Sequence, residues 1–294
     1  MAMRVFVRVI ESGSFTRAAE TLDLPKASVS QYVARLEAHL GVRLLQRTTR
    51  RLSATVDGSA YYERARDLLA DLAELESGVS NAGLSPRGRL RVDVPAAYGR
   101  HVLVPALPDF FARYPDIVLE VGSSDRPVDL LQEGVDCVIR GGEVHDEALI
   151  GRRLTTYEVL TCATPSYLAR RGTPEHPDEL RQHDLIGYFS AKTGRIYALD
   201  FERGDQRIDI DGPWRVALND ADSFLAAGIA GLGVLQVVRS AWIERHIESG
   251  ALTPILRDWR CEPLAQHILY PSRRHLSSRV RVFVDWVVER LGDH

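Results

Sequence analysis

The hydrophobic positions between residues 14 and 40 predict two short helices joined by a tight turn. In the first helix the apolar residues share one face, and Ser14 stands where a side-chain oxygen would cap the first turn. Pro25 suits the first turn of the second helix, because an N–H would have no partner there. The second helix is expected from about Lys26 to Leu40 with one buried stripe. The apolar positions are Phe15, Ala18, Ala19 and Leu22, then Val29, Val33, Leu36 and Leu40.

The other face of the second helix carries short or hydrogen-bonding side chains near its N-terminus. This is the part of a recognition helix that meets base edges in the major groove of double-stranded DNA. The pattern therefore predicts a DNA-binding helix-turn-helix. A plain amphipathic helix pair with a solvated polar face is the alternative for this segment taken alone. The residues of the polar face are Lys26, Ala27, Ser30, Gln31 and Arg35.

Residues 42–55 continue with two short apolar stretches on either side of a basic, hydroxyl-rich tip. This pattern predicts a β-hairpin wing. Arg47, Arg50 and Arg51 would lie at the tip or its base, where arginines contact phosphates or enter a minor groove. The wing strengthens the prediction of DNA binding beyond what the helix pair supports.

Charge is distributed unevenly along the chain. Residues 1–58 hold nine Lys or Arg and five Asp or Glu, a net charge of +4, whereas the whole chain has −3. The remainder therefore carries −7. A basic N-terminal module on an acidic body is expected when only one end of a protein meets a polyanion.

A long helix is expected from Tyr61, since no glycine or proline occurs before Gly78. Its apolar residues are spaced alternately by four and three, which is a heptad stripe. Such a narrow stripe favours self-association, although a helix docked on its own domain is the alternative. Residues 83–88 then indicate a hinge. The stripe consists of Tyr61, Ala65, Leu68, Leu72, Leu75 and Val79.

From Leu90 onward, strand and helix patterns alternate, which predicts a parallel sheet covered by helices. A second unit of this kind follows between residues 214 and 249, and the tail is again a strand and a helix. The expected strands are 90–94, 117–121, 137–139, 214–218, 234–237 and 268–270, and the expected helices are 102–114, 128–133, 221–230, 241–249 and 280–291.

Several motifs in the first 55 residues carry a resemblance to a known family. They are Phe6 and Val9 in an opening helix, Ser14-Phe15-Thr16 leading into Ala18-Ala19, Ser28-Val29-Ser30 followed by Leu36-Glu37, Leu40-Gly41-Val42, and the wing from Arg47 to Thr55. With these motifs, and through its C-terminal body, the chain resembles the LysR-type transcriptional regulators. The chain departs from the family in starting only a few residues before its first helix, which puts the N-terminal contacts of that helix in doubt.

The resemblance implies a bacterial, sequence-specific DNA-binding transcriptional regulator that a small effector controls. It implies an α/β body of two Rossmann-like subdomains, similar to periplasmic solute-binding proteins, behind an N-terminal, mostly α winged helix-turn-helix domain and a long linker helix. The expected DNA-binding domain is 1–58, the dimerisation linker and hinge 59–86, and the effector-binding domain 87–294, with subdomain I at about 87–161 and 265–294 and subdomain II at about 162–264.

The resemblance also assigns roles and partners. Lys26, Ala27, Ser30 and Gln31 would face bases, while Ser14, Thr16, Arg35, Arg47 and Arg50 would hold phosphates. The implied partners are operator DNA, a small-molecule effector, the transcription machinery and further copies of the chain, as a homodimer or a homotetramer. We expect no cofactor.

The effector is expected at the carboxyl ends of the strands, where loops lead into helix N-termini. Free amides in the first loop would favour an anion, and Arg140 would pair with it, so an anionic or aromatic metabolite is the hypothesis. Asn219 and Asp220 would contact the ligand or merely cap the following helix, with equal weight. The candidate effector-binding residues are Ala96, Ala97, Tyr98, Gly99, Arg140, Gly141, Asn219, Asp220 and Gln236.

The sequence argues against other classes of protein. It contains no nucleophile elbow, phosphate loop or metalloprotease motif, and His145-Asp146-Glu147 lacks metal-ligand spacing, so no enzyme and no metal site are expected. Cys137, Cys162 and Cys261 form no Cys-x-x-Cys pair, and packing is their expected role. The alternative of a free solute-binding protein would not explain the basic N-terminal module or the heptad stripe. Without an export signal or a long apolar run, a cytoplasmic protein with no membrane partner is expected.

Overall fold

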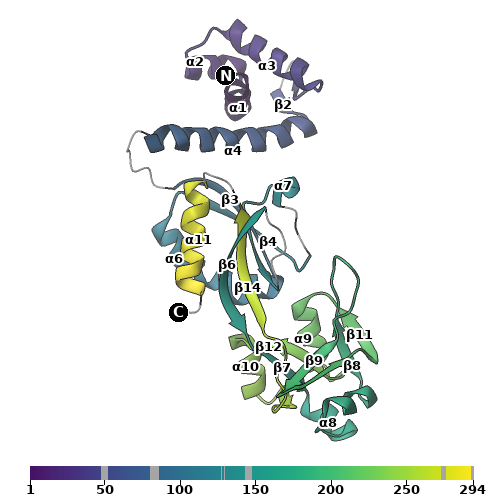
Figure 1. Cartoon of the computed structure of the whole chain (residues 1–294). Helices are drawn as coiled ribbons and strands as arrows, with labels where there is room; N and C mark the ends of the chain where they lie inside the picture. The colour runs from purple at the N-terminus through teal and green to yellow at the C-terminus, as the bar shows by residue number, and fades with distance from the viewer. Residues whose placement is uncertain are drawn as a thin grey trace. The chain divides into compact units, whose positions relative to one another are not determined.

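The computed structural model describes residues 1–47, 52–79, 86–126, 128, 130–142, 148–272 and 276–292 (Figure 1). The chain divides into two compact units, Met1–Gly88 and Arg89–His294. Each unit has a hydrophobic core of its own, with Phe6 and Val33 in the first and Phe110 and Trp286 in the second. None of the helices in these described ranges has both the length and the apolar character needed to span a membrane.

The N-terminal unit begins with three helices that pack against one another, α1 (Ala2–Ser12), α2 (Phe15–Leu22) and α3 (Lys26–Leu40). The Ser14 hydroxyl accepts the Arg17 N–H at 3.4 Å, which caps α2 as the sequence predicts. Asp23 ends α2 in the left-handed region with φ 52°, and α3 follows Pro25. The helix-turn-helix predicted from the apolar stripes is therefore present.

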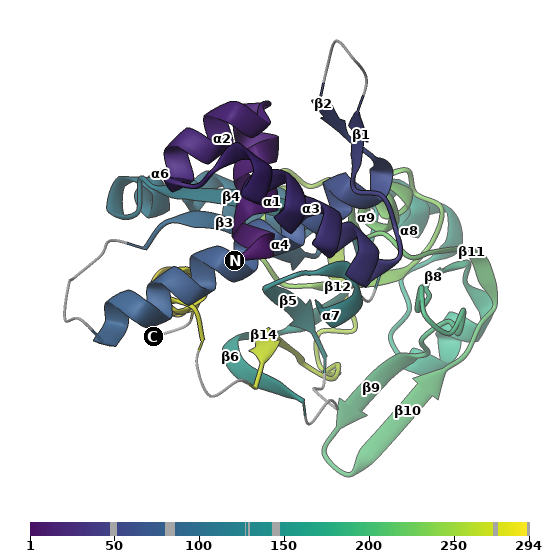
Figure 2. The ribbon, with the colours of Figure 1, turned by 90° about the horizontal axis from the view of Figure 1, so that it is seen from above.

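A short antiparallel hairpin and a long helix complete this unit. Strand β1 (Leu45–Arg47) pairs with β2 (Leu52–Ala54), and Figure 2 shows both strands projecting beyond the helices. Helix α4 (Val56–Val79) begins before the predicted linker start at residue 59. The Thr55 hydroxyl accepts the Gly58 N–H at 2.9 Å, which caps the first turn of α4.

The heptad stripe of α4 has two different surroundings. Ala65 is buried in the core of the N-terminal unit, and Tyr61 packs edge-on against Phe6 with ring centroids 5.5 Å apart. Leu68 and Leu72 are 57% and 44% exposed. The start of the stripe is thus docked on its own domain, which is the alternative named in the sequence analysis, and self-association through the rest of the stripe stays a prediction. The side chains of Leu75 and Val79 lie outside the described residues.

Subdomain I contains the larger sheet of the C-terminal unit, with strand order β4-β3-β5-β14-β6. Strand β3 is parallel to β5, whereas β14 is antiparallel to both β5 and β6, so the sheet is mixed and not parallel as predicted. Helices α6 and α11 lie on one side of the sheet (Figure 1). Its elements are β3 (Gly88–Val94), α5 (Ala96–Tyr98), η1 (Gly99–Leu103), α6 (Val104–Arg113), β4 (Ile117–Ser123), α7 (Leu130–Glu133), β5 (Cys137–Gly141), β6 (Leu149–Tyr157), β14 (Leu264–Pro271) and α11 (Ser278–Leu291).

Subdomain II has three small sheets, β12-β7-β13, β11-β8 and β10-β9. Only β8 and β11 are parallel; the other pairs are antiparallel. The chain enters this subdomain between β6 and β7 and returns from β13 to β14, as the resemblance implies. Its elements are β7 (Val159–Ala163), α8 (Pro165–Arg171), η2 (Pro177–Gln182), β8 (Leu185–Tyr188), β9 (Leu199–Arg203), β10 (Gln206–Ile210), β11 (Trp214–Leu218), α9 (Ala221–Ile229), β12 (Leu235–Val238), α10 (Ala241–Glu248) and β13 (Thr253–Ile255).

Candidate DNA-binding surface and ligand cleft

The solvent face of α3 carries the polar residues singled out in the sequence. Lys26, Ala27, Gln31 and Arg35 are exposed and Ser30 is half-buried, whereas the stripe on the opposite side is buried. Four of the five side chains of this face are therefore open to solvent among the described residues. A helix with such a face fits the major groove, where side-chain donors and acceptors meet base edges.

Two further predicted contacts come from α2 and the residue before it. Thr16 is exposed, and together with Lys26 it lines a shallow hollow where α2 meets the start of α3. Ser14 is half-buried because its hydroxyl caps α2. The structure thus gives Ser14 a structural role, and its predicted phosphate contact stays a prediction.

The wing is tied directly to α3. Glu37 accepts the backbone N–H groups of Leu44 and Leu45 on the same oxygen, at 2.9 and 3.0 Å. Arg47 ends β1, but its side chain lies outside the described residues, as do Arg50 and Arg51. The predicted arginine contacts of the wing therefore stay predictions.

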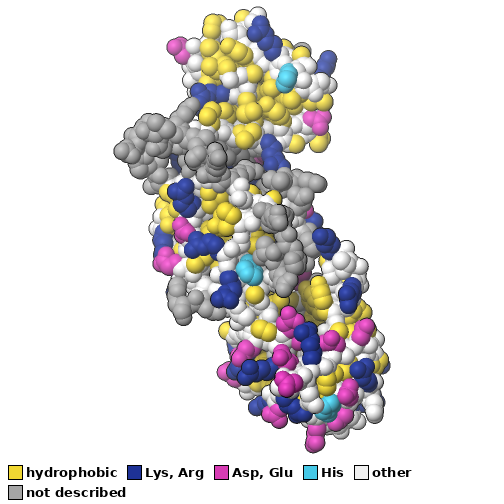
Figure 3. All heavy atoms as spheres, viewed as in Figure 1, with side chains coloured by type: hydrophobic (Ala, Val, Ile, Leu, Met, Phe, Trp, Pro, Cys, Tyr) yellow, Lys and Arg dark blue, Asp and Glu magenta, His cyan; other side chains and the backbone are white. Residues whose placement is uncertain are grey.

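Charged side chains are distributed differently over the two units. On the face seen in Figure 3, acidic side chains are sparse over the N-terminal helices, whereas acidic and basic side chains are mixed over subdomain II. The face of α3 adds Lys26 and Arg35 to this surface. A polyanion would meet less repulsion on the N-terminal unit than on subdomain II.

The first predicted ligand loop leads from β3 into continuous helical backbone. The N–H of Gly99 donates to the Pro95 carbonyl at 2.8 Å, and that of Ala96 donates to Asp125 at 3.1 Å. Ala97 and Tyr98 are buried, and Tyr98 belongs to the core of subdomain I. Burial and the nearby Tyr157 raise the pKa of the Tyr98 phenol. The expectation of free amides at Ala97, Tyr98 and Gly99 is wrong at Gly99, because its N–H already has a partner.

Arg140 is also engaged within the protein. Its guanidinium forms an ion pair with Asp93 and donates to the carbonyls of Ile139 at 2.8 Å and Arg126 at 3.1 Å. The predicted role of Arg140 as the partner of an anionic ligand is therefore not supported by its contacts. Gly141 ends β5 close to Leu264, which a Cβ at this position would touch at 3.1 Å.

Three predicted residues of subdomain II also have partners within the protein. Asp220 accepts the Ser223 N–H at 2.7 Å, so the capping role is the one that the structure supports. The Asn219 carbonyl accepts the Tyr188 hydroxyl at 3.1 Å. Gln236 donates to the Asp200 carbonyl at 2.9 Å and to the Cys261 sulfur at 3.1 Å, so its amide is committed within subdomain II.

Asp125, which no sequence motif indicated, lies just after β4 and joins the two subdomains. Its carboxylate accepts the Ala96 N–H in subdomain I and, in subdomain II, the Ala221 N–H at 3.0 Å and the Tyr188 hydroxyl at 3.3 Å. The position of Asp125 after a strand, at the edge where the predicted ligand loops lie, is the signal that could have found it.

A second set of contacts joins the two subdomains. Asp222 on α9 pairs with Arg100 at 3.0 Å and with His101 at 3.7 Å, both from η1. The His101 ring stacks on Trp242 with centroids 5.2 Å apart. Charged and aromatic side chains from both subdomains thus contact one another at this junction.

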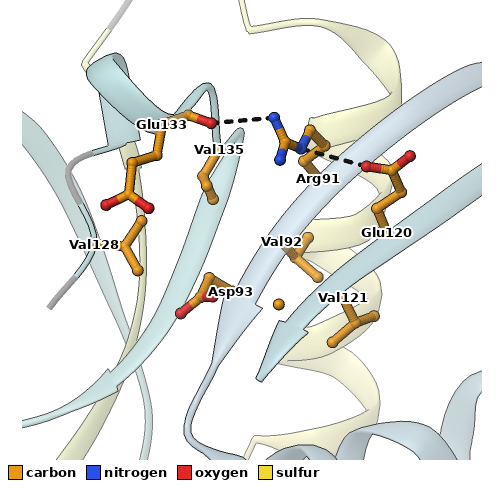
Figure 4. Close-up of a pocket in the computed structure, with 9 residues that line it drawn as sticks. Arg91, Val92, Asp93, Glu120, Val121, Val128, Glu133 and Val135 are labelled. Carbon is orange, nitrogen blue, oxygen red and sulfur yellow. Dashed lines mark hydrogen bonds and ion pairs between the residues drawn. The ribbon is translucent and has the colours of Figure 1, made fainter. Parts of the chain in front are cut away.

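A separate cavity of about 300 Å³ lies within subdomain I, between β3, β4 and the segment around α7 (Figure 4). Arg91 pairs with Glu120 at 3.3 Å and donates to the Glu133 carbonyl at 3.1 Å. Asp93 lines the same cavity and is paired with Arg140. This cavity could not be predicted from the sequence, because its residues come from separate strands and turns that share no motif.

The cysteines have the surroundings of packing residues. Cys137 and Cys162 are buried, and Cys261 is half-buried. Burial raises the pKa of Cys162 to about 12 and that of Cys261 to about 11, so both are thiols at neutral pH. No group of three or more potential metal ligands occurs in the part of the chain that the structure describes.

A winged helix-turn-helix joined to a two-lobed α/β unit defines a class of proteins, the ligand-controlled DNA-binding transcriptional regulators. Family models support this class over most of the chain. Residues 1–59 match the bacterial regulatory helix-turn-helix protein of the lysR family, and residues 84–292 match the LysR substrate binding domain. The chain belongs to the LysR family of transcriptional regulators. It is a DNA-binding regulator with an effector-binding domain and not an enzyme.

Individual relatives are similar over their full lengths. The chain is 42% identical to an HTH-type transcriptional repressor of Pseudomonas aeruginosa strain UCBPP-PA14, over 100% of this chain and 92% of that protein. The structure of CrgA, a LysR-type regulator from Neisseria meningitidis, is similar with 33% identity and TM-score 0.62, over 99% of this chain and 98% of that chain. The full-length structure of AphB, a virulence activator of Vibrio cholerae, has 26% identity and TM-score 0.62, over 99% and 98% of the two chains.

Proposed function

We propose that the exposed face of α3 reads an operator sequence. Lys26, Ala27, Ser30 and Gln31 would contact bases, because they lie together on the solvent face of a helix whose opposite side is buried. That shared face is the observation that carries the proposal. The surrounding residues Ser14, Thr16, Arg35, Arg47, Arg50 and Arg51 would contact phosphates.

The test is binding of the full chain to genomic DNA fragments selected by the protein itself. Measured by fluorescence anisotropy, affinity for a selected fragment should fall steeply as salt rises, because phosphate contacts release counterions. A scrambled fragment of the same length and composition is the control. Equal affinity for the selected and scrambled fragments at every salt concentration would contradict the proposal.

The effector would lie in the cleft between the two subdomains, near Asn219, Gly141 and the loop that begins at Ala96. Support comes from the junctions that Asp125 and Asp222 form, because a ligand between the walls would replace contacts that hold the two subdomains together. Such a ligand would change the arrangement of the two subdomains. This change would alter how the protein binds DNA and the transcription machinery. Thermal-shift screening of small metabolites tests this, and aromatic compounds are expected among the stabilising ones.

Copies of the chain would associate through α4, as a homodimer or a pair of such dimers. Leu68 and Leu72 support this, because both are apolar and exposed on the heptad stripe. Replacing both with glutamate should lower the mass found by sedimentation, and an unchanged mass would count against α4. Because its operator lies on bacterial DNA, we also propose that the protein works in the cytoplasm.

A further inference from the structure

The cavity within subdomain I is lined by a buried carboxylate that has bonding capacity left. Asp93 is only 8% exposed, and its Oδ1 is the oxygen that pairs with Arg140. Its Oδ2 has no hydrogen-bond partner in the part of the chain that the structure describes. A carboxylate oxygen held this far from bulk solvent favours any molecule in the cavity that brings a donor to it.

A glycine leaves this oxygen open to the cavity. Gly122 of β4 lines the cavity together with Asp93, and a Cβ at this position would collide with Asp93 Oδ2. Gly122 is not among the glycines with positive φ, so glycine provides space here and not backbone freedom. The space above Gly122 is therefore part of the cavity.

Arg91 is the second polar group of the cavity with a free position. Its Nε pairs with Glu120 at 3.3 Å and its Nη1 donates to the Glu133 carbonyl, which leaves Nη2 without a recorded partner among the described residues. Arg91 and Asp93 are two residues apart on β3, so they lie on the same face of the sheet with their Cα atoms roughly 7 Å apart. Figure 4 shows both beside the same cavity. A small ligand can reach a donor and an acceptor here at once.

The charges around the cavity are already compensated. The carboxylates of Asp93, Glu120 and Glu133 line it, and each is paired with an arginine. An anion would meet the open oxygen of Asp93, and a cation would meet the guanidinium of Arg91, so a neutral ligand is favoured. The remaining wall is apolar and consists of Val92, Val121, Val128 and Val135.

We propose that this cavity is a second small-molecule site, which takes a neutral ligand with a carboxamide on a compact apolar body. The amide N–H donates to Asp93 Oδ2, the amide carbonyl accepts from Arg91, and the valines contact the apolar part. A cavity of about 150 Å³ holds benzene, so about 300 Å³ accommodates a ring that carries an amide. Every lining residue belongs to subdomain I, and the inference therefore does not depend on an effector in the cleft.

The test is titration of the full-length protein with benzamide, followed by ligand-observed NMR. Benzoate is measured in parallel, because it has the same shape and carries a carboxylate in place of the amide. Asp93→Asn keeps the size of the side chain and removes its charge, whereas Gly122→Ala places a methyl group against Asp93 Oδ2. The matched control is Asp205→Asn, which changes an exposed carboxylate in the turn between β9 and β10.

We expect saturable binding of benzamide by the wild type and at least about tenfold weaker binding of benzoate. Asp93→Asn and Gly122→Ala should each lose at least about tenfold in benzamide affinity, and Asp205→Asn should lose none. Circular dichroism verifies that each variant is folded, and Gly122→Ala decides alone if Asp93→Asn does not fold. The inference is overturned if the wild type does not bind benzamide, if it binds benzoate equally well, or if folded Gly122→Ala keeps the full benzamide affinity.

Discussion

The Glu37 carboxylate accepts the backbone N–H of Leu44 at 2.9 Å, which joins α3 to the start of the wing. The same oxygen accepts the N–H of Leu45, and both of these residues are buried. Glu37 thus holds the start of the wing against α3, together with the packing of Leu44 and Leu45 in the core of the N-terminal unit. Any DNA that contacts both elements meets them in a fixed arrangement.

Glu37→Ala should destabilise the N-terminal unit by about 1–3 kcal/mol, because it leaves two backbone donors without their acceptor. Glu37→Gln keeps an acceptor oxygen and should cost less, since only the charge is lost. Chemical denaturation of the full chain measures both. Ala38→Ser, an exposed change on the next residue of α3, is the control. If Glu37→Ala left both stability and operator affinity unchanged, the hydrogen bonds of Glu37 to Leu44 and Leu45 would have no energetic role.

Gly58→Ala should be destabilising although Gly58 is helical. Alanine is normally favoured over glycine within a helix by about 0.5–1 kcal/mol. Here a Cβ would collide with the backbone carbonyl of Leu44. Backbone atoms cannot move aside as the end of a flexible side chain can. We expect a loss of about 1–3 kcal/mol, typical of forcing an extra carbon into a packed site. Ser59→Ala, exposed on the same turn, should change little, and a more stable Gly58→Ala protein would refute the steric argument.

Gln31→Ala and Arg35→Ala should affect DNA binding in different ways. Loss of the Gln31 amide should cost about 1–3 kcal/mol on the selected operator and relax the preference at one base position. Loss of the Arg35 charge should weaken binding similarly on all sequences and reduce the salt slope by about one. Anisotropy with single-base variants of the operator separates the two patterns. Identical effects of both substitutions on every fragment would exclude base reading by Gln31.

The stability of the protein should fall in mild acid, partly through His183. Burial, with the charge of Arg171, lowers the pKa of His183 below the ordinary 6.5. As pH falls through about 6.5, the unfolded chain binds a proton at His183 before the folded chain does, so folding stability is lost down to the folded pKa. His183→Asn should flatten this part of the stability profile measured by urea denaturation between pH 5 and 7.5. The same change at the exposed His39 is the control, and an equal slope in both variants would contradict the assignment.

Elements with regular periodicity were predictable from the sequence, and long-range pairings were not. The stripe of α3 was predictable because Val29, Val33 and Leu36 repeat at helical spacing and are all buried. The direction of β14 was not, because its partners β5 and β6 lie more than a hundred residues earlier in the chain. The hairpin of β9 and β10 was not predicted, although Leu199 and Phe201, and Ile208 and Ile210, alternate with polar residues and face a core cluster.

The candidate ligand site shows the same division. The loops at the strand ends were found, because the edge of an α/β sheet can be inferred from the order of its elements. The partners of their side chains could not be found. Arg140 meets Asp93 from 47 residues away, and Ala221 meets Asp125 from 96 residues away. Only the folded chain shows that side chains expected to hold a ligand, such as Arg140, are bound to other residues of the protein.

The return of the chain to subdomain I has a consequence for synthesis. The core of subdomain I needs Phe283 and Trp286 from α11, whereas the N-terminal unit is complete once α4 has been made. A ribosome adds about 5–20 residues per second, so roughly 10–40 s separate the two events. During that time a nascent chain carries a finished DNA-binding unit and an unfinished sensor. Control by an effector therefore begins only when the last helix has joined the sheet.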